Sequence, residues 1–281
     1  MIWKIRQNTV SFGRTLLMGV LNITPDSFFD GGSYLNPEAA YQHAVELVEE
    51  GADILDLGAE STRPGAVPVT DREELDRLLP VLKRIRKEVS VPISIDTVRP
   101  EVAKECLEAG ADIINDVSGL KRSGPDMAKV VRKFGAGLVL MHSRGTSETM
   151  QELASYDDIV PDVMSELRES IQVATDAGIE RERIVVDPGL GFAKTPEQNL
   201  EILKKISVFH KLGLPVLVGS SQKSFIGKVT GREAKGRAFG TAACVAACVR
   251  EGVQILRVHD VKAMRDVILM TEAIQQTTSS K

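Results

Sequence analysis

The sequence predicts one α/β domain over residues 1–281, an eight-stranded parallel (β/α) barrel of the TIM type with a short N-terminal β-hairpin. Three observations predict this fold. The chain of 281 residues is 43% hydrophobic, which suits one large core. Short apolar strands alternate with amphipathic helices along the whole chain. Each predicted strand also ends beside a polar residue, as is typical of barrel enzymes.

The two ends of the chain lie outside this alternation. Residues 2–15 alternate apolar and polar side chains around positions 7–9, which predicts a hairpin within residues 1–15. Residues 275–281 are rich in Thr and Ser, and they are predicted to form a frayed tail.

Eight strands follow one another at regular intervals. They are predicted at residues 16–21, 53–57, 92–95, 112–114, 137–141, 183–186, 215–218 and 254–258. Helices are predicted between them, for example from Pro37 after an Asn36 N-cap, and from an Asp71 cap. The segments EEGADILDLG and EAGADIINDV repeat one pattern of helix, glycine, strand and polar end. A doubly wound open sheet is the alternative, and it is less favoured because no G-x-G-x-x-G follows the first strand.

Charge, hydrophobic runs and cysteine content argue against several classes of protein for this chain. The net charge of -4 provides no basic footprint for nucleic acid. No run is long and apolar enough to span a bilayer, and the first residues lack the apolar core of a secretory signal. The cysteines Cys106, Cys244 and Cys248 indicate neither a disulfide framework nor a metal site with histidine. These features predict a cytoplasmic protein with small-molecule partners, which binds neither nucleic acid nor a membrane.

Polar side chains at the strand ends form the candidate site. The C-terminal ends of barrel strands converge on one mouth. The residues there are Asn22, Asp56 with Glu60 and Thr62, Asp96, Asn115, His142, Asp187, Ser220 with Ser221, and Arg257 with His259. One polar residue after one strand is ordinary, but the pattern at all eight strands indicates an active site. His142 has no neighbour that marks it as a base, so it is expected to be a packed histidine.

Three of these residues suit a flat ligand. Asp96, Asn115 and Asp187 are acceptors that match a heterocycle with N–H donors along its edge. Lys223, just beyond the seventh strand, can donate to a ring carbonyl. A buried ion pair between Lys223 and Asp187 is the alternative, and the glycines around Asp187 make it less favoured.

Other residues suit anions. Arg257 and His259 are two apart on the last strand, so they face the same way, and both can donate to phosphate oxygens. Asn22 offers an oxygen to a hard cation if substrate phosphates supply the other ligands. Residues 220–223 precede a helix, where they can hold a carboxylate of a second substrate or simply cap the helix. The residues alone therefore predict a barrel enzyme that binds a flat polar heterocycle and a phosphate group.

Seven blocks in order along the chain resemble the signatures of the dihydropteroate synthase family. They are MGVLNITPDSF, GAESTRPG, SIDT, INDVSG, DPGLGFAK, SSQKSFIG and RVHD. The resemblance covers essentially the whole chain, and it implies a barrel transferase of folate biosynthesis. The implied reaction joins 6-hydroxymethyl-7,8-dihydropterin diphosphate to 4-aminobenzoate and releases 7,8-dihydropteroate and diphosphate. Diphosphate leaves in an SN1-like step, and the arylamine then attacks the pterin cation.

The resemblance also implies roles for individual residues. The pterin would be held by Asp96, Asn115, Asp187 and Lys223. The diphosphate would be held by Asn22, Thr62, Arg257 and His259, with Mg2+ as the cofactor at Asn22. The 4-aminobenzoate pocket would be bordered by Thr62, Arg63, Pro64, Phe192 and Ser221. Catalysis would depend on Asn22, Thr62, Arg63, Lys223, Arg257 and His259. A homodimer and sensitivity to sulfonamides are also implied, and the loops 22–36 and 59–70 are expected to close over the site.

The chain departs from the family pattern at two positions. Gln222 stands where the family usually has Arg, and Ala59 stands where it usually has Gly. Loss of a cation at Gln222 is expected to weaken the binding of 4-aminobenzoate, the second substrate. Two alternatives follow: a non-catalytic or altered pterin-binding paralogue, and an enzyme similar to methyltetrahydrofolate methyltransferases. The second is disfavoured because RVHD and the Asn22 loop suit a diphosphate, which its substrate lacks.

Overall fold

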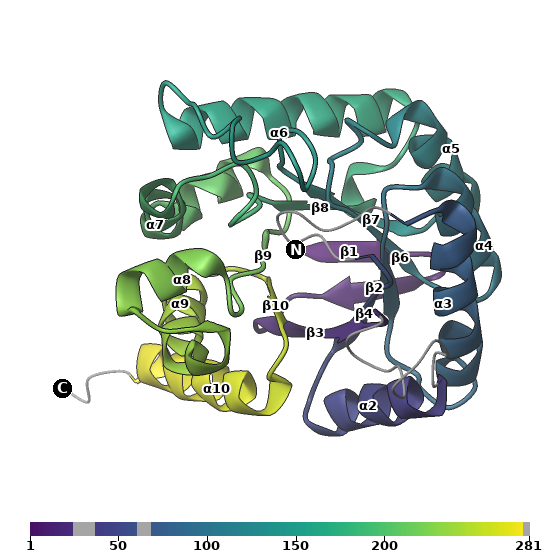
Figure 1. The fold of residues 1–281 in the computed structure, drawn as a ribbon, viewed down its shortest axis with the longest axis horizontal. Helices are drawn as coiled ribbons and strands as arrows, with labels where there is room; N and C mark the ends of the chain where they lie inside the picture. The colour runs from purple at the N-terminus through teal and green to yellow at the C-terminus, as the bar shows by residue number, and fades with distance from the viewer. Residues whose placement is uncertain (25–36, 61–68, 278–281) are drawn as a thin grey trace.

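The computed structural model describes residues 1–24, 37–60 and 69–277, and it confirms the predicted parallel barrel (Figure 1). Its eight strands follow the order β8-β7-β6-β5-β4-β3-β10-β9. A parallel bridge between Val186 and Val216 joins the two ends of this sheet, and the Val186 N–H donates to the Pro215 carbonyl at 3.0 Å. The sheet is therefore closed, which rules out the open doubly wound alternative.

The strands and helices alternate as expected. The barrel strands are β3 (Leu16–Asn22), β4 (Ile54–Gly58), β5 (Ile93–Asp96), β6 (Ile113–Asp116), β7 (Gly137–Met141), β8 (Ile184–Asp187), β9 (Leu217–Val218) and β10 (Ile255–Val258). The helices are α2 (Pro37–Glu49), α3 (Asp71–Ile85), α4 (Pro100–Glu108), α5 (Gly124–Phe134), α6 (Ile159–Asp176), α7 (Pro196–Lys204), α8 (Ser224–Thr230), α9 (Ala238–Arg250) and α10 (Val261–Gln276). Short 3-10 helices occur at η1 (Arg181–Arg183), η2 (Ile206–Leu212) and η3 (Ala234–Gly236). None of the described helices is long and apolar enough to cross a membrane.

Two helix ends differ from the prediction. The N-cap of α3 is Thr70 and not Asp71, because the Thr70 hydroxyl accepts the Glu73 N–H while the Glu73 carboxylate accepts the Thr70 N–H. This capping box satisfies two backbone donors that the first turn leaves open. At the other end of the chain, α10 runs to Gln276, two residues into the predicted tail.

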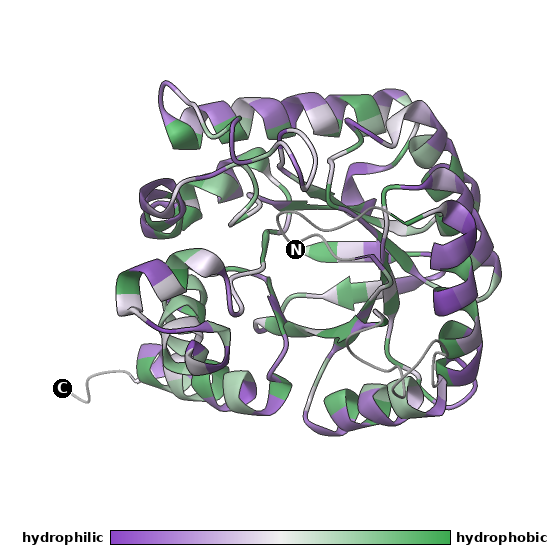
Figure 2. Ribbon diagram, in the orientation of Figure 1, coloured by the Kyte–Doolittle hydropathy of each residue, from purple (hydrophilic) through white to green (hydrophobic). Residues whose placement is uncertain are grey.

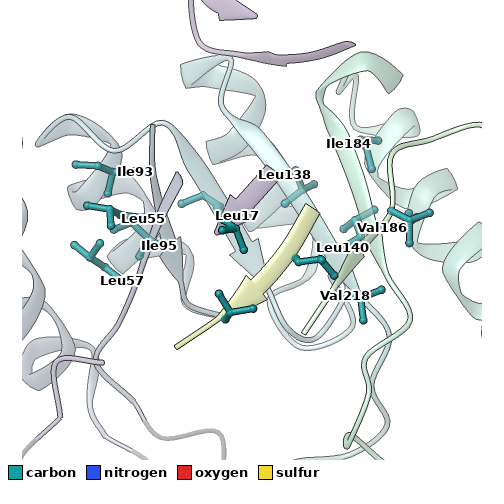
Figure 3. Packing of buried hydrophobic residues seen from close by; sticks show 14 of the residues in the cluster. Leu17, Leu55, Leu57, Ile93, Ile95, Leu138, Leu140, Ile184, Val186 and Val218 are labelled. Atoms are coloured by element: carbon teal, nitrogen blue, oxygen red, sulfur yellow. The ribbon is translucent and has the colours of Figure 1, made fainter. Parts of the chain in front are cut away.

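Side chains alternate in direction along each strand, which divides the core into two parts. One set faces the helices and forms the main core, including Leu55, Leu57, Ile95 and Leu140 (Figure 3). Figure 2 shows the matching pattern on the helices, which are hydrophobic towards the sheet and hydrophilic on their outer faces. The other set faces the barrel interior. At the N-terminal end of the barrel these residues are apolar, namely Met18, Ile54, Ile113, Val139, Val185, Leu217 and Ile255.

The N-terminal hairpin closes this apolar end of the barrel. It pairs β1 (Ile2–Ile5) with β2 (Asn8–Ser11), so its turn lies at residues 6–7, slightly before the predicted position. Trp3 and Ile5 are fully buried against the interior residues, and the Trp3 indole N–H donates to the Arg183 carbonyl at 2.8 Å. A Cβ on Gly137 would lie 2.6 Å from Ile5 Cγ2, so only glycine permits this close contact. The hairpin therefore keeps water out of the lower half of the barrel.

We expect Trp3→Ala to destabilise the protein by roughly 3–5 kcal/mol, because it opens a cavity beneath the barrel and leaves a buried carbonyl without its donor. Ile2→Ala is the matched control, since Ile2 is 45% exposed in the same strand. Urea unfolding of both variants measures the difference. A loss below about 1 kcal/mol for Trp3→Ala would show that the hairpin is only a peripheral addition.

Candidate active site

The upper half of the barrel interior is polar. The same alternation that places apolar residues at the floor places Asp56, Asp96, Asn115, Asp187 and Arg257 inside the barrel near the C-terminal ends of the strands. The register confirms the common level, since Asp96 pairs with Asn115 across β5 and β6. Sequence-predicted residues from five separate strands are therefore brought together above the apolar floor.

The guanidinium of Arg257 lies between two carboxylates. Its Nε donates to Asp56 Oδ2 at 2.6 Å and its Nη2 donates to Asp96 Oδ2 at 3.0 Å. Asn115 Nδ2 also donates to Asp56 Oδ2, at 3.2 Å. Asp56 is fully buried, and within the described part of the chain its Oδ1 has no hydrogen-bond partner. Opposite charges at such short range in a barrel interior hold one another in fixed orientations.

Asp56 is the residue whose role the sequence reasoning missed. From the sequence, Asp56 is one polar residue near a strand end, with no separate role assigned to it. The structure places it inside β4, where it contacts both Arg257 and Asn115. The signal was present, because a charged residue in the middle of the buried strand ILDLG must have a charged or polar partner.

Asp187 and Lys223 lie at the next strand ends. Asp187 is 5% exposed, and its Oδ1 accepts the Gly189 N–H at 2.7 Å. Lys223 Nζ lies over the Phe192 ring, 4.3 Å from its centroid, which is a cation–π contact. Among the ion pairs of the described residues, none joins Lys223 to Asp187. Phe192 and Lys223 are therefore neighbours. This contact is expected if Phe192 borders one substrate and Lys223 borders the other.

The electrostatics of these groups are governed by burial. Burial raises the pKa of Asp187 from 3.8 to about 6, against the Gly189 N–H and the charge of Lys223. It also raises the pKa of Asp96, where Arg257 opposes the rise and Asp56 adds to it. Burial and the nearby Arg257 lower the pKa of Lys223 to about 8. Between these pKa values of Asp187 and Lys223, an ionised acceptor faces a charged donor across the mouth of the barrel.

Ser221 and His259 form a second pair at the ends of β9 and β10. The His259 N–H donates to Ser221 Oγ at 3.3 Å, and His259 Nδ1 lies 2.9 Å from the same oxygen. Because that oxygen already accepts the backbone N–H, its own proton can bond Nδ1 of a neutral imidazole. In the tautomer where the Ser221 hydroxyl donates to Nδ1, the ring proton resides on Nε2, which makes Nε2 a donor.

Asn22 ends β3 and is half-buried, paired in register with Gly58 on β4. Thr62, Arg63 and Pro64 lie outside the described residues, as does most of the loop that follows Asn22. The described ends of the second loop are both held by Arg99. Its guanidinium pairs with Glu60 and donates to the Val69 carbonyl at 2.6 Å.

The two departures from the family pattern lie in different surroundings. Ala59 is fully buried. Gln222 has an exposed side chain and a left-handed backbone with φ 57°. Its N–H donates to Thr241 Oγ1 at 3.1 Å and its carbonyl accepts from Arg237 Nη1 at 2.8 Å. The backbone of Gln222 is therefore held independently of its side chain, which leaves that side chain free to differ between relatives.

A pocket opens at the mouth of the barrel, with an empty volume of about 500 Å³ that includes open solvent. Its lining includes Asp96, Thr97 and Phe192, so the Asp96 carboxylate and the aromatic ring face one space. Charged and hydroxyl side chains in this lining, with Phe192 beside them, suit a small polar ligand. His142 does not line it; this side chain is buried behind the strand ends, against Lys194.

The comparisons agree with this geometry. Residues 18–259 match the family model described as pterin binding enzyme, so the fold and the site belong to a pterin-binding barrel enzyme. The dihydropteroate synthase of Bacillus subtilis is 46% identical over 261 residues, covering 93% of this chain and 89% of the relative. The chain belongs to the dihydropteroate synthase family, whose members are transferases of folate biosynthesis.

Solved structures give the same result. A dihydropteroate synthase from Clostridium difficile, determined in the presence of pteroic acid, has a TM-score of 0.89 at 44% identity, covering 95% of this chain and 98% of its own. The Yersinia pestis dihydropteroate synthase in a sulfonamide drug complex has a TM-score of 0.92 at 38% identity, covering 99% of this chain and 100% of its own.

We expect Asp187→Asn to stabilise the empty protein above about pH 6. The raised pKa means that the folded state disfavours the ionised carboxylate; this cost is fully present above about 6 and absent below about 3.8. Asparagine is neutral throughout, and its amide oxygen can still accept the Gly189 N–H. Urea unfolding should show a gain near pH 8 that shrinks towards pH 4, whereas Asp126→Asn, an exposed control on α5, should not. A less stable variant near pH 8 would contradict the assigned cost of the buried charge.

Proposed function

We propose that this chain condenses 6-hydroxymethyl-7,8-dihydropterin diphosphate with 4-aminobenzoate to give 7,8-dihydropteroate and diphosphate. The observation that carries the proposal is the set of acceptors Asp96, Asn115 and Asp187 on the inner face of the barrel, in a member of the dihydropteroate synthase family. A reduced pterin presents ring and amino N–H groups, and buried acceptors strongly favour a ligand that satisfies them.

The proposed roles follow from position. Asp96, Asn115 and Asp187 accept the N–H groups of the pterin edge, and Lys223 donates to its ring carbonyl. Arg257 has five N–H groups, of which the two ion pairs use two, so others can serve the diphosphate. His259 adds its Nε2 proton, as supported by the contact between its Nδ1 and Ser221.

The described contacts support catalysis by positioning and not by a protein nucleophile. The C–O bond to diphosphate breaks and the leaving group takes the bonding pair. The amino nitrogen of 4-aminobenzoate then forms the new C–N bond and loses one proton. Arg257 and His259 stabilise the leaving charge, and Phe192 and Ser221 orient the arylamine. The roles assigned to Thr62, Arg63 and Pro64 remain part of the proposal, on residues outside the described chain.

We include Mg2+ in the proposal, held by Asn22. The amide oxygen of Asn22 belongs to the ligand class that this cation prefers, and Gly58 leaves space beside it because it has no side chain. Among the described residues, no group of three or more His, Cys, Asp or Glu is placed to hold a metal ion, so substrate oxygens would complete the coordination. When bound, the cation neutralises charge on the diphosphate.

Release of diphosphate from the pterin substrate, with and without 4-aminobenzoate, tests the function. We expect release and 7,8-dihydropteroate formation that both depend on the arylamine. A paralogue without catalysis would bind the pterin and release no diphosphate. An enzyme of the methyltetrahydrofolate type would ignore the diphosphate substrate altogether.

Chelation tests the metal. We expect excess EDTA to abolish turnover while pterin binding falls less, because Asp96, Asn115 and Asp187 do not depend on the cation. Added Mg2+ in excess of the chelator should restore the rate and serves as the control. Full activity in EDTA would remove the metal from the proposal.

We expect Gln222→Arg to strengthen 4-aminobenzoate binding without changing pterin affinity, since the side chain lies one residue from Ser221 and its backbone is separately held. A new cation near a carboxylate is worth about 0.5–1 kcal/mol at an exposed position, or roughly two- to fivefold. Arylamine titration in the presence of pterin and diphosphate measures the change, with Gln222→Met as the uncharged control. An equal gain with Gln222→Met would show that charge is not the cause.

We further propose a homodimer. Exposed apolar side chains lie on three neighbouring C-terminal helices, α8, α9 and α10 (Figure 1), at Val229, Phe239, Met270 and Ile274. Phe239 is 90% exposed, and such side chains commonly mark an interface. Sedimentation equilibrium should give a dimer that Phe239→Ser weakens. A monomer at micromolar concentration would contradict this arrangement.

A cytoplasmic location is also part of the proposal. All three cysteines lie in the described chain as free thiols, at positions 106, 244 and 248. Free cysteines in a protein of this size are typical of a reducing compartment. Cell fractionation tests this, and recovery outside the cytoplasm would contradict it.

A further inference from the structure

The loop after β8 has an unfavourable backbone conformation. Two residues of the proposed site depend on it: Asp187 comes directly before the loop and Phe192 lies within it. Between and beyond them, Gly189, Gly191 and Ala193 all have positive φ, of 69°, 83° and 49°. Ala193 pays a steric cost there that glycine avoids. A Cβ on Gly189 would lie 1.9 Å from the His142 carbonyl, so the loop is pressed against the end of β7. Contacts elsewhere must hold this segment in place.

The buried side chain of Lys194 supplies those contacts. It is 3% exposed, and its Nζ lies 3.0 Å from the Gly189 carbonyl and 2.9 Å from the Phe192 carbonyl. Its third neighbour is His142 Nδ1, at 2.9 Å. An ammonium group has three N–H donors, and here each has one acceptor. Lys194 thus ties together the two halves of the loop and the end of β7.

His142 can accept this bond only as a neutral ring with its proton on Nε2. That nitrogen lies 3.3 Å from Glu166 Oε2 on α6, within ion-pair distance, although the two atoms lack the geometry of a hydrogen bond. Glu166 also receives Arg144 Nε at 2.8 Å and pairs with Lys121, so it is held as an anion behind the histidine. Glu166, His142 and Lys194 thus lie in succession behind the loop that carries Phe192.

We propose that Lys194 is a positioning residue for the pterin site. Its ammonium group is held by His142, with Glu166 behind the histidine, and it fixes the backbone that carries Asp187 and Phe192. This inference rests on the proposed function. Tyr156 assists from the same side, since its hydroxyl donates to the Ala193 carbonyl at 2.9 Å and its ring stacks under the Arg144 guanidinium.

The charges around Lys194 favour a charged lysine beside a neutral His142. Burial lowers the pKa of Lys194 to about 7; Asp187 and Glu166 oppose this, while Arg144 and Lys121 add to it. Burial and the charge of Lys194 lower the pKa of His142 to about 4, against Glu166. Between these values the lysine carries the proton and the histidine accepts its bond, as the geometry requires.

Lys194→Met keeps the length of the side chain and removes all three donors. We expect it to weaken pterin binding by about tenfold or more and to raise KM for 4-aminobenzoate, with a smaller change in kcat, because both substrates contact the displaced loop. Lys204→Met, an exposed position on α7, is the matched control. Calorimetry of the pterin diphosphate substrate and steady-state kinetics give the readouts, with circular dichroism to confirm folding. Affinity and both KM values within about twofold of wild type would overturn the proposal.

A second pair of variants tests the role of His142 and covers the case in which Lys194→Met does not fold. His142→Leu leaves one buried Lys194 donor unpaired, whereas His142→Gln offers an amide oxygen in its place. We expect His142→Leu to weaken pterin binding and His142→Gln to restore most of it. In Lys194→Met, adding His142→Leu should have little further effect. Equal binding by His142→Leu and wild type would overturn the proposal, and a wild type that does not bind the pterin would instead overturn the proposed function.

Discussion

The ion pairs of Arg257 with Asp56 and Asp96 determine how the rest of the site is built. A guanidinium alone inside a barrel would be unstable, and two carboxylates alone would repel each other. Together they satisfy one another, and Asn115 shares Asp56 Oδ2. The strength of these contacts depends on the absence of water, and that in turn depends on the apolar floor and on Trp3 and Ile5 beneath it. The N-terminal hairpin therefore contributes to the electrostatics of a site at the opposite end of the barrel.

Burial of these charged groups also lowers the stability of the folded protein. The pKa values of Asp187 and Asp96 are raised, and that of Lys223 is lowered, because burial disfavours the charged form of each group. A ligand edge rich in N–H groups would replace the water that these acceptors have lost. In this way the empty barrel stores part of the free energy that pterin binding releases, in keeping with the common exchange of stability for function at active sites.

Much of this could be read from the sequence because a parallel barrel has a simple rule. Side chains alternate along each strand and all strands end at one mouth, so Asp96, Asn115 and Asp187 had to converge once the eight strands were recognised. The exact first residue of a helix is harder to predict. Thr70 and Asp71 are both good helix caps, and only the reciprocal bond with Glu73 decides between them.

Contacts between distant segments could not be read in this way. The sequence places Asp56 near a strand end, but its partner Arg257 is 201 positions away. Lys194, His142 and Glu166 lie on three different segments, and no spacing rule connects a lysine after one strand with a histidine after another. The ion-pair alternative for Lys223 also required coordinates, because sequence cannot distinguish a carboxylate neighbour from the Phe192 ring.

Acceptors on the inner face of the barrel are proposed to bind the pterin edge, and calorimetric titration of the pterin diphosphate substrate into wild type and Asp187→Asn tests this directly. The substitution places an amide donor where a substrate N–H requires an acceptor, and opposed buried donors cost roughly 1–3 kcal/mol. The expected result is affinity about tenfold weaker in a variant that remains folded. Equal affinity for the two proteins would remove Asp187 from the site and contradict the account.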